Sequence, residues 1–409
     1  MTPSLRILFY DDAGELGGHE LMSLAALRHA VAQPNVEAGF MFFRGNKQLS
    51  GQLTDLAARH LNFRALPQDY ASRRFQAFRT LVSVRAIRRI AAAITDYAPD
   101  VIVVAQGAIA YCSAGLTAAK RTGVPTISYI PMTHPERLFS ASRFKAALRE
   151  LVNRIYYRLP DEYITISKRM EDYLRRRRLR QPVTVVQNGI DLTAYHSADR
   201  DTARATLGFR DGDWVVGLIG RVQFWQKRQD LAVKALALAR REIAPLRLLV
   251  VGDGPDLAAL KGLARAEGVE DAVVFAGWTN DLSSIYSAID ALVIPSRYEG
   301  VPLVMLEGMY FRRPVIAAAV DGMADTLPPQ WLFPSGDAVA LAARMVEVVR
   351  LRDPVRLDAH RELVLHSFSM PAFEQAFMAA IRSIVARHQA ARHSGAPTAR
   401  EPGGRNGIA

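Results

Sequence analysis

The sequence of 409 residues has a single cysteine, Cys112, and no long hydrophobic run. One cysteine excludes an internal disulfide and is typical of proteins from a reducing compartment. A membrane-spanning helix needs about 20 consecutive apolar residues, so the sequence predicts none. The nine histidines lack the spacing of a structural zinc site, and the N-terminus lacks a signal-peptide pattern. We therefore expect a cytoplasmic protein without a structural metal.

Several signatures of ligand-binding proteins are also missing. The turn at residues 252–255 has two glycines but not the third glycine of the dinucleotide fingerprint, which disfavours a nicotinamide oxidoreductase. The first loop, residues 11–20, lacks the Gly-Lys-Ser/Thr ending of a phosphate-binding P-loop. No recognised base-reading motif accompanies the basic residues, so we expect no nucleic-acid partner.

Acidic residues are scarce in the N-terminal half of the chain. Residues 1–190 contain 27 Lys and Arg against 15 Asp and Glu, whereas residues 191–409 contain 25 of each. The whole net charge of +12 therefore belongs to the first half. This asymmetry predicts that the first half meets an anionic partner.

Short apolar runs alternate with helical patterns along the whole chain, in two successive sets. Strands that are apolar on both faces and alternate with helices are typical of parallel sheets covered by helices. The sequence therefore predicts an α/β fold with two doubly wound, Rossmann-like domains, whose ligands bind at the carboxyl ends of the strands. The predicted strands are residues 5–10, 38–43, 101–104, 126–130, 163–166, 183–187, 214–219, 246–251, 273–275, 291–294 and 315–317. The predicted helices are residues 20–31, 73–97, 109–122, 142–158, 228–241, 256–268, 282–288, 303–311 and 338–351.

The domain boundary is expected in residues 188–213, which are weakly periodic and rich in Gly, Asp, Thr and Ser. The first domain then covers residues 1–190 and the second covers residues 191–370. A final helix is predicted over residues 371–391. The tail, residues 392–409, is rich in Gly, Pro and Arg, which predicts disorder.

Two cations and two carboxylates occur where the second predicted sheet should bind ligands. Arg221 and Lys227 follow a predicted strand, and a guanidinium with an ammonium suits a diphosphate. Glu299 follows another strand, and Glu307 lies about two turns into the next helix. This spacing allows the acids to hold opposite ends of one polar ligand. Solvated surface cations remain the alternative for Arg221 and Lys227.

Loop residues of the first half supply weaker candidates. Gly17 and Gly18 stand at a helix entrance, where backbone N–H groups can receive an anion, although the acidic neighbours suit acceptor hydroxyls instead. His134 lies between prolines after a strand and can bind a sugar hydroxyl or assist proton transfer. A histidine that only satisfies loop backbone is the alternative. His19 is a weaker candidate of the same kind.

Three basic segments carry most of the excess charge. Residues 73–90 and 142–158 have the pattern of amphipathic helices with cationic polar faces, and residues 175–178 are four consecutive arginines. Such faces bind anionic lipid headgroups, although an ordinary solvated helix face is the alternative for any one of them. Their concentration in one half favours contact with a membrane surface.

These motifs, taken in order, resemble those of the retaining GT-B glycosyltransferases, specifically the group 1 or family 4 set. The similar motifs are Gly17-Gly18-x-Glu20, the segment at residues 186–191, Gly220-Arg221 with Lys227, the turn at residues 252–255, Gly277-Trp278, and Pro295-Ser296 before the two glutamates.

The resemblance implies a role for each matching residue. Arg221 and Lys227 would neutralise the diphosphate of a nucleotide-sugar, Glu299 would face the sugar, and Glu307 would hold the ribose. His134 would contact the sugar from the opposite domain across a cleft. Residues implied in donor binding besides Glu307 are Gly17, Gly18, Gly252, Trp278, Gly300, Val301, Leu303 and Val304.

The family's reaction would be a configuration-retaining sugar transfer without metal or other cofactor. The final helix would cross back onto the first domain. The expected acceptor is a lipid-linked or cell-envelope saccharide at the inner face of the membrane, because the first domain is basic. Arg228 after the lysine, and Asp321-Gly322 with Asp325 in place of the usual Gly-Gly and Glu, depart from the family's pattern. The alternatives are an epimerase of the same architecture and a non-catalytic membrane-surface adaptor.

Overall fold

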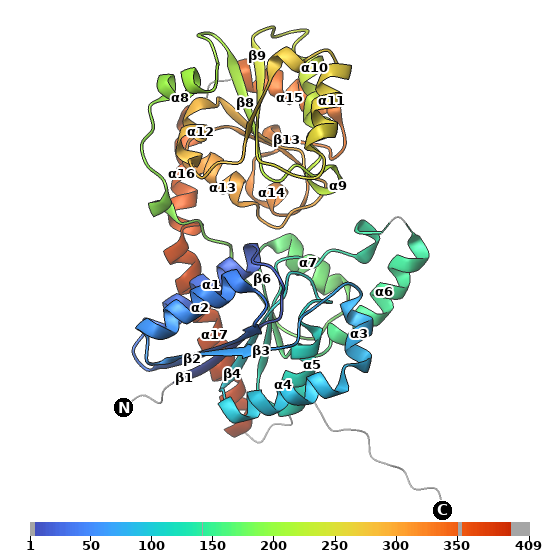
Figure 1. Ribbon diagram of the computed structural model, residues 1–409, viewed down its shortest axis with the longest axis vertical. Coiled ribbons are helices and arrows are strands. Elements are labelled where there is room, and N and C mark those ends of the chain that lie inside the picture. Colours follow the sequence, from blue (N-terminus) through green and yellow to red (C-terminus); the bar gives the residue numbers. More distant parts are fainter. Residues whose placement is uncertain (1–4, 141, 351–353, 394–409) are drawn as a thin grey trace, which may run out of the picture. The chain divides into compact units, whose positions relative to one another are not determined.

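The computed structural model describes residues 5–140, 142–350 and 354–393. The chain divides into two units (Figure 1). The first unit comprises residues 1–165, 176–186 and 374–409, and the second comprises residues 166–175 and 187–373. The predicted tail, residues 392–409, lies outside the described residues except for its first two positions.

The first unit is built on a seven-stranded sheet whose paired strands are all parallel, in the order β3-β2-β1-β4-β5-β6-β7. The strand β4 (Val101–Ala105) is buried at every position, because helices cover both faces of the sheet. The remaining strands are β1 (Leu5–Asp11), β2 (Val36–Phe43), β3 (Phe63–Gln68), β5 (Thr126–Tyr129), β6 (Glu162–Thr165) and β7 (Val183–Val185).

Helices join these strands and cover the sheet. Their apolar faces are buried, as at Leu24 and Leu27 of the first helix, which is the main source of their stability. These helices are α1 (Gly18–Val31), α2 (Lys47–Arg59), α3 (Gln76–Val82), α4 (Val84–Tyr97), α5 (Ser113–Thr122), η1 (Glu136–Leu138) and α6 (Arg143–Tyr156). The helix α7 (Lys168–Arg176) follows β6 along the chain, but all of it except Arg176 belongs to the second unit.

The second unit has a six-stranded parallel sheet in the order β10-β9-β8-β11-β12-β13. Sequential strands β8, β9 and β10 run toward one edge, and β11, β12 and β13 run toward the other. The order therefore reverses between β8 and β11, where the loops of a doubly wound sheet part to admit a ligand. The strands are β8 (Trp214–Ile219), β9 (Leu246–Val251), β10 (Val273–Gly277), β11 (Ala291–Ile294), β12 (Val315–Ala318) and β13 (Leu332–Phe333).

Besides α7, this unit contains helices that begin in the segment expected to be a weakly structured boundary. They are η2 (Leu192–Ala194), α8 (Arg200–Thr206), α9 (Phe224–Lys227), α10 (Gln229–Ala239), α11 (Leu257–Ala266), η3 (Glu270–Ala272), α12 (Leu282–Ala288), α13 (Leu303–Tyr310), α14 (Asp321–Thr326), η4 (Pro329–Trp331), α15 (Ala338–Arg350) and α16 (Pro354–Ser367).

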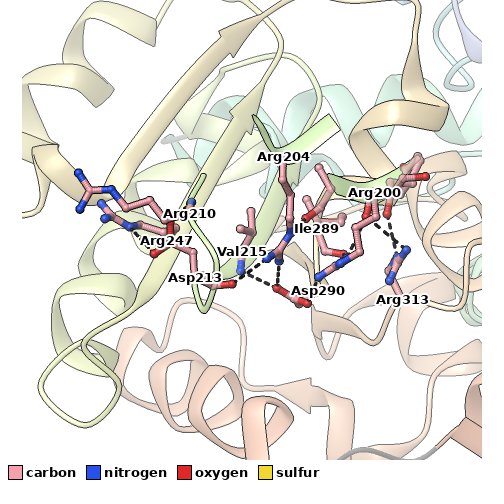
Figure 2. A network of polar contacts seen from close by, with 12 residues as sticks. Arg200, Arg204, Arg210, Asp213, Val215, Arg247, Ile289, Asp290 and Arg313 are labelled. Carbon is pink, nitrogen blue, oxygen red and sulfur yellow. Dashed lines mark hydrogen bonds and ion pairs between the residues drawn. The ribbon is translucent and has the colours of Figure 1, made fainter. Parts of the chain in front are cut away.

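An arginine network fixes α8 to this second unit (Figure 2). Arg200 and Arg204 each donate to a different oxygen of the Asp290 carboxylate, at 2.5 and 2.6 Å, and the backbone N–H of Val215 donates to the same group at 2.8 Å. Arg200 also donates to the carbonyl of Ile289. Arg313 donates to the carbonyl of residue 286 at the end of α12, and burial lowers the pKa of Arg313 to about 10. The linker is therefore part of the folded unit.

The last helix, α17 (Met370–His393), begins in the second unit and continues in the first from Glu374 onward. Within the first unit, the Phe377 ring meets the Tyr129 ring edge-on at 5.2 Å. Arg387 donates two hydrogen bonds to the Glu162 carboxylate. One continuous helix therefore belongs to both units.

The structure corrects several predicted elements. The helix expected over residues 73–97 is two helices, α3 and α4, because the chain leaves the helical conformation at Ser83. The helix expected from residue 109 begins at Ser113, since Cys112 before it has a left-handed φ of 55°. The helix expected over residues 228–241 is likewise preceded by a break at Arg228, whose φ is 53°. Strands β3 and β13 and helices α2, α7, α8, α9, α14 and α16 were not predicted.

None of the described helices is long and apolar enough to cross a membrane.

Candidate functional site

Lys227, the last residue of α9, forms an ion pair with Glu299 in the loop after β11. The ammonium Nζ donates to Glu299 Oε1 at 2.6 Å. The carboxylate is buried, whereas the lysine is about a quarter exposed. The sequence placed these residues 72 positions apart, and the parallel strands bring them to the same edge of the sheet. The pair is a charged centre whose lysine has two further donors for a ligand.

The loop that carries Glu299 is held from two sides by backbone hydrogen bonds. The N–H of Arg297 donates to the carbonyl of Gln226 in α9 at 2.8 Å. The N–H of Glu299 itself donates to Asp321 Oδ2 at 2.8 Å, and the N–H of Gly322 donates to the carbonyl of Gly300 at 3.0 Å. The carboxylate is therefore positioned by its neighbours before any ligand arrives.

Asp321 and Gly322 stand where the expected pattern has two glycines. Asp321 replaces the first glycine, and Gly322 keeps the second. Asp321 is buried and has a left-handed φ of 47°, a conformation that glycine adopts without strain. A Cβ at Gly322 would lie 2.5 Å from the carbonyl oxygen of Gly300, so this position requires glycine. The exchange of the first glycine for Asp thus adds an acceptor for the Glu299 loop.

An open cavity of about 620 Å³ lies at the carboxyl ends of β8 and β9. Arg221, Gly252 and Trp278 line it. A Cβ at Gly252, whose φ is 127°, would lie 2.2 Å from the carbonyl oxygen of Gly220. The glycines therefore allow the two loops to pack together beneath the cavity. The exposed Arg221 and Trp278 side chains offer a cation and an aromatic surface for a ligand.

Glu307 lies on α13 and is held by two tyrosines that the sequence gave no reason to select. Tyr195 donates to Oε1 at 2.8 Å, and Tyr286 donates to Oε2 at 2.6 Å. Burial raises the pKa of Glu307, although both hydroxyls oppose this change. Phe311 stacks on Tyr286 at 5.0 Å between ring centroids. Each carboxylate oxygen can accept a second hydrogen bond, which leaves capacity for a hydroxyl ligand.

The start of α13 carries the other predicted donor-binding residues of this loop. The helix begins at Leu303, one residue after Pro302, which is its N-cap. Val301 is buried, and Leu303 and Val304 are half-buried. The first N–H groups of a helix have no partner within the helix and attract anions or sugar oxygens. The roles of these residues in donor binding stay predictions.

In the first unit, Gly17 is the N-cap of α1, and its N–H donates to Glu20 Oε2 at 2.9 Å. The same carboxylate lies 3.0 Å from His19 Nδ1, and Asp11 Oδ2 lies 3.6 Å from His19 Nε2. Gly18 begins the helix next to this cluster. Burial lowers the pKa of His19 to about 4 and raises that of Glu20 to about 7.

Asp11, His19 and Glu20 also form the group of described residues whose ligand atoms suit a metal ion, all within 4.8 Å of one another. Burial raises the pKa of Asp11 well above its usual range, which disfavours the charged form that a metal requires. Glu20 already caps α1. The prediction that no metal is used remains untested.

His134 is buried at the wall of a second cavity, of about 370 Å³, that lies within the first unit. Its carbonyl accepts from Arg177 at 3.2 Å, and its ring meets Phe139 edge-on. Phe75, Tyr111 and Arg149 also line this cavity. His134 and the Lys227–Glu299 pair belong to different units, and its predicted contact with the donor sugar stays a prediction.

Two family models match the chain. One, described as glycosyl transferases group 1, matches residues 213–350, and the other, described as glycosyltransferase family 4, matches residues 51–194. Together they cover more than half of the chain, in the order of its two sheets. The chain belongs to the group 1, family 4 glycosyltransferases. Its fold is of the GT-B class.

Curated relatives agree with this family. A D-inositol 3-phosphate glycosyltransferase of Rhodococcus erythropolis is 40% identical over 150 residues, which are 34% of each chain. A 2-deoxystreptamine glucosyltransferase of Streptomyces kanamyceticus is 28% identical over 275 residues, which are 63% of this chain and 70% of the relative. The match spans about a third of the length of the first of these relatives.

Solved structures of other proteins resemble this chain over most of its length. Anabaena HepE in complex with UDP has a TM-score of 0.73 at 19% identity, covering 93% of this chain and 100% of that one. The lipopolysaccharide outer core galactosyltransferase WaaB has a TM-score of 0.68 at 18% identity, covering 93% and 99%. At this identity the likeness establishes the fold alone.

Proposed function

We propose that the protein transfers a sugar from a nucleotide-diphosphate sugar to an acceptor hydroxyl with retention of configuration. The observation that carries this proposal is the Lys227–Glu299 pair, held at the edge of the second sheet by Gln226 and Asp321. A lysine and an acid so fixed, with Arg221 in a neighbouring loop, suit a diphosphate joined to a sugar.

The charges match those that develop during the transfer. The bond between the anomeric carbon and the phosphate oxygen breaks, so the diphosphate gains negative charge and the sugar gains positive charge. Arg221 and Lys227 stabilise the first, and the Glu299 carboxylate favours the second. The new bond forms to the acceptor oxygen on the face that the phosphate leaves. The departing phosphate takes the acceptor proton, and attack on the face that the phosphate leaves accounts for retention.

The remaining predicted residues orient the donor. Glu307 accepts from the ribose hydroxyls in addition to its two tyrosines, and Trp278 flanks the base. Backbone groups of Gly300 and residues 301–304 hold the sugar. Gly252 lets the cavity floor approach the ligand closely. The two fixed cations supply the positive charge that a metal would otherwise provide, so we propose a metal-independent reaction.

The first unit supplies the acceptor side. His134 contacts the sugar, and the helix entrance at Gly17 and Gly18 approaches the diphosphate. The net charge of this part of the sequence favours an acceptor presented at an anionic membrane, such as a lipid-linked or cell-envelope saccharide. Nucleic acid is not part of the proposal.

A thermal-shift panel of nucleoside diphosphates and nucleotide-sugars tests the donor, since a bound ligand raises the unfolding temperature by mass action. We expect at least one diphosphate to stabilise the wild type, and Lys227→Ala to lose most of that shift. NMR of the product made with the stabilising nucleotide-sugar then tests retention at the anomeric carbon. No stabilisation by any diphosphate would contradict the proposal and favour a non-catalytic adaptor.

An assay without acceptor separates transfer from epimerisation on the same architecture. A transferase consumes nucleotide-sugar only slowly in this assay and releases nucleoside diphosphate rapidly when the acceptor is added. Accumulation of an epimerised sugar without acceptor would overturn the transferase assignment. Retained activity in the presence of a chelator is the result expected for a metal-independent reaction.

A further inference from the structure

Exposed apolar side chains are concentrated on one part of the first unit. Fifteen large hydrophobic residues are exposed among those that the structure describes, and eight of them lie on or beside α3 and α6. Soluble proteins rarely gather exposed apolar residues without an interaction that covers them. These eight are Phe75, Leu81, Val82, Val84, Phe144, Leu148, Leu151 and Ile155.

The four residues on α6 form one continuous stripe. Phe144, Leu148, Leu151 and Ile155 are spaced by four, three and four residues, so at 100° per residue they fall within an arc of about 60°. Their exposed fractions are 77, 44, 59 and 49%. The opposite face is buried at Ala146, Asn153 and Tyr156. The helix therefore packs against its unit with one side and shows a second apolar face outward.

Cations flank this stripe on both sides. Arg143, Lys145, Arg154 and Arg158 are exposed. The single acid in the sequence of α6, Glu150, is half-buried, and its carboxylate accepts from Arg177 at 3.2 Å. An apolar stripe bordered by basic residues is the arrangement of helices that lie in the interface of an anionic bilayer.

The neighbouring α3 extends the same surface. Tyr156 of α6 donates to the carbonyl of Ala77 in α3 at 2.5 Å, and the two helices lie side by side in Figure 1. The ring of Phe75, at the start of α3, lies under the guanidinium groups of Arg74 and Arg149, at 4.8 and 5.5 Å. Leu81 and Val82 are exposed at its other end.

We propose that α6 and α3 dock the first unit onto an anionic lipid bilayer. The α6 stripe enters the boundary between headgroups and acyl chains, while the flanking cations bind lipid phosphates. A second copy of this chain is disfavoured as the occupant, because a two-fold contact would bring the same cations together. A nucleic acid would match the charge but not the apolar stripe.

This inference rests on the proposed function for its purpose and extends it to a defined surface. The 370 Å³ cavity that contains His134 is also lined by Phe75 and Arg149. Docking through these helices would place the mouth of that cavity beside the lipid headgroups. A lipid-linked acceptor would then reach the cavity without leaving the membrane.

Vesicle co-sedimentation of the full chain tests the docking. We expect binding to vesicles of 30% phosphatidylglycerol in phosphatidylcholine, and at least tenfold weaker binding to phosphatidylcholine alone. The apolar variant Phe144→Ser with Leu151→Ser and the charge variant Lys145→Glu with Arg154→Glu should each reduce binding to the anionic vesicles at least tenfold. Val339→Ser is the matched control, because Val339 is 69% exposed on α15, and it should bind like the wild type.

The outcomes separate this proposal from the proposed function. All substituted positions are exposed, and the nucleotide thermal shift should be the same in each variant as in the wild type. Wild type that is stabilised by a nucleoside diphosphate but does not bind anionic vesicles would overturn the docking and leave the transferase intact. Equal vesicle binding by the apolar variant would also overturn it. A dimer in light scattering that the apolar variant abolishes would assign the surface to a second copy.

Discussion

The two units share a doubly wound sheet but differ in what they place around it. In the second unit, charged side chains form buried or half-buried ion pairs, such as Lys227 with Glu299 and Arg204 with Asp290. In the first, α6 leaves cations and an apolar stripe exposed together. One architecture thus carries a pre-positioned polar centre and a surface suited to lipid. The shared backbone fold determines where the loops lie, and their side chains determine what kind of ligand or surface they suit.

The first strand–helix loops show the same contrast. After β1 the chain places buried acids, and burial raises the pKa of Asp11 and of Asp12. After β8 it places Gly220 and the exposed Arg221. The exposed cation after β8 therefore suits the charge of a diphosphate better than the buried acids after β1.

The strongest test of this difference between the units is to remove the two cations of the second unit. Lys227→Ala and Arg221→Ala should each lower kcat/KM about a hundredfold, equivalent to about 2.7 kcal/mol. The matched control is Lys234→Ala, an exposed lysine on α10. Steady-state kinetics on folded proteins provide the measurement. Near-normal turnover by Lys227→Ala would remove the basis for assigning the diphosphate to this unit.

The next largest effect is on the stability of the second unit. Asp290→Ala leaves Arg200 and Arg204 without their shared carboxylate, and we expect a loss of about 2 kcal/mol in the free energy of unfolding. Chemical denaturation measures this loss. Asp211→Ala, in an exposed turn, is the control and should change the free energy by less than about 0.5 kcal/mol. An equal effect of both variants would mean that the network does not fasten α8.

Substitution at Asp321 tests whether the Glu299 loop must be held. Asp321→Gly tolerates the left-handed φ but removes the acceptor of the Glu299 N–H, so kcat should fall about tenfold, equivalent to about 1.4 kcal/mol. Asp321→Asn keeps an acceptor oxygen and tolerates the same φ, so it should restore most of kcat. A change in KM alone, or equal kcat in the glycine and asparagine variants, would argue against a positioning role.

The smallest effect concerns the acidic loop of the first unit. Burial raises the pKa of Glu20 to about 7, so the folded state holds more protons on this group than the unfolded state between about pH 4.5 and 7. Its contribution to stability is therefore lost as pH rises through that range. Glu20→Gln keeps an acceptor for the Gly17 N–H and should flatten this loss.

The lowered pKa of His19 has the opposite effect between about pH 4 and 6.5, so the difference between variant and wild type is the informative quantity. Urea denaturation at half-unit pH intervals measures it, with Glu15→Gln as the exposed control. Parallel pH curves for Glu20→Gln and wild type would contradict the assigned proton on Glu20.

The sequence predicted the two parallel sheets because strands buried on both faces are short, apolar and β-branched, as at residues 101–104 and 291–294. It also identified the carboxyl-edge residues Arg221, Lys227 and Glu299, because charged and glycine residues directly after such strands interrupt an otherwise apolar pattern. The strand β3 was not predicted, since Leu66 and Pro67 interrupt its alternation of apolar and polar residues. The helix break at Ser83 was not predicted either, because the amphipathic pattern continues across it.

Only the tertiary structure decided which side chains meet. Tyr195 and Tyr286 contact Glu307 from 112 and 21 residues away, and no local pattern marks a tyrosine whose partner lies on another element. Asp321 supports the loop of Glu299 for the same reason. The hydrophobic period and the composition of a segment determine which of its side chains are buried against its own sheet. Contacts between loops depend on how the elements pack together. The same packing determines that the second face of α6 stays exposed.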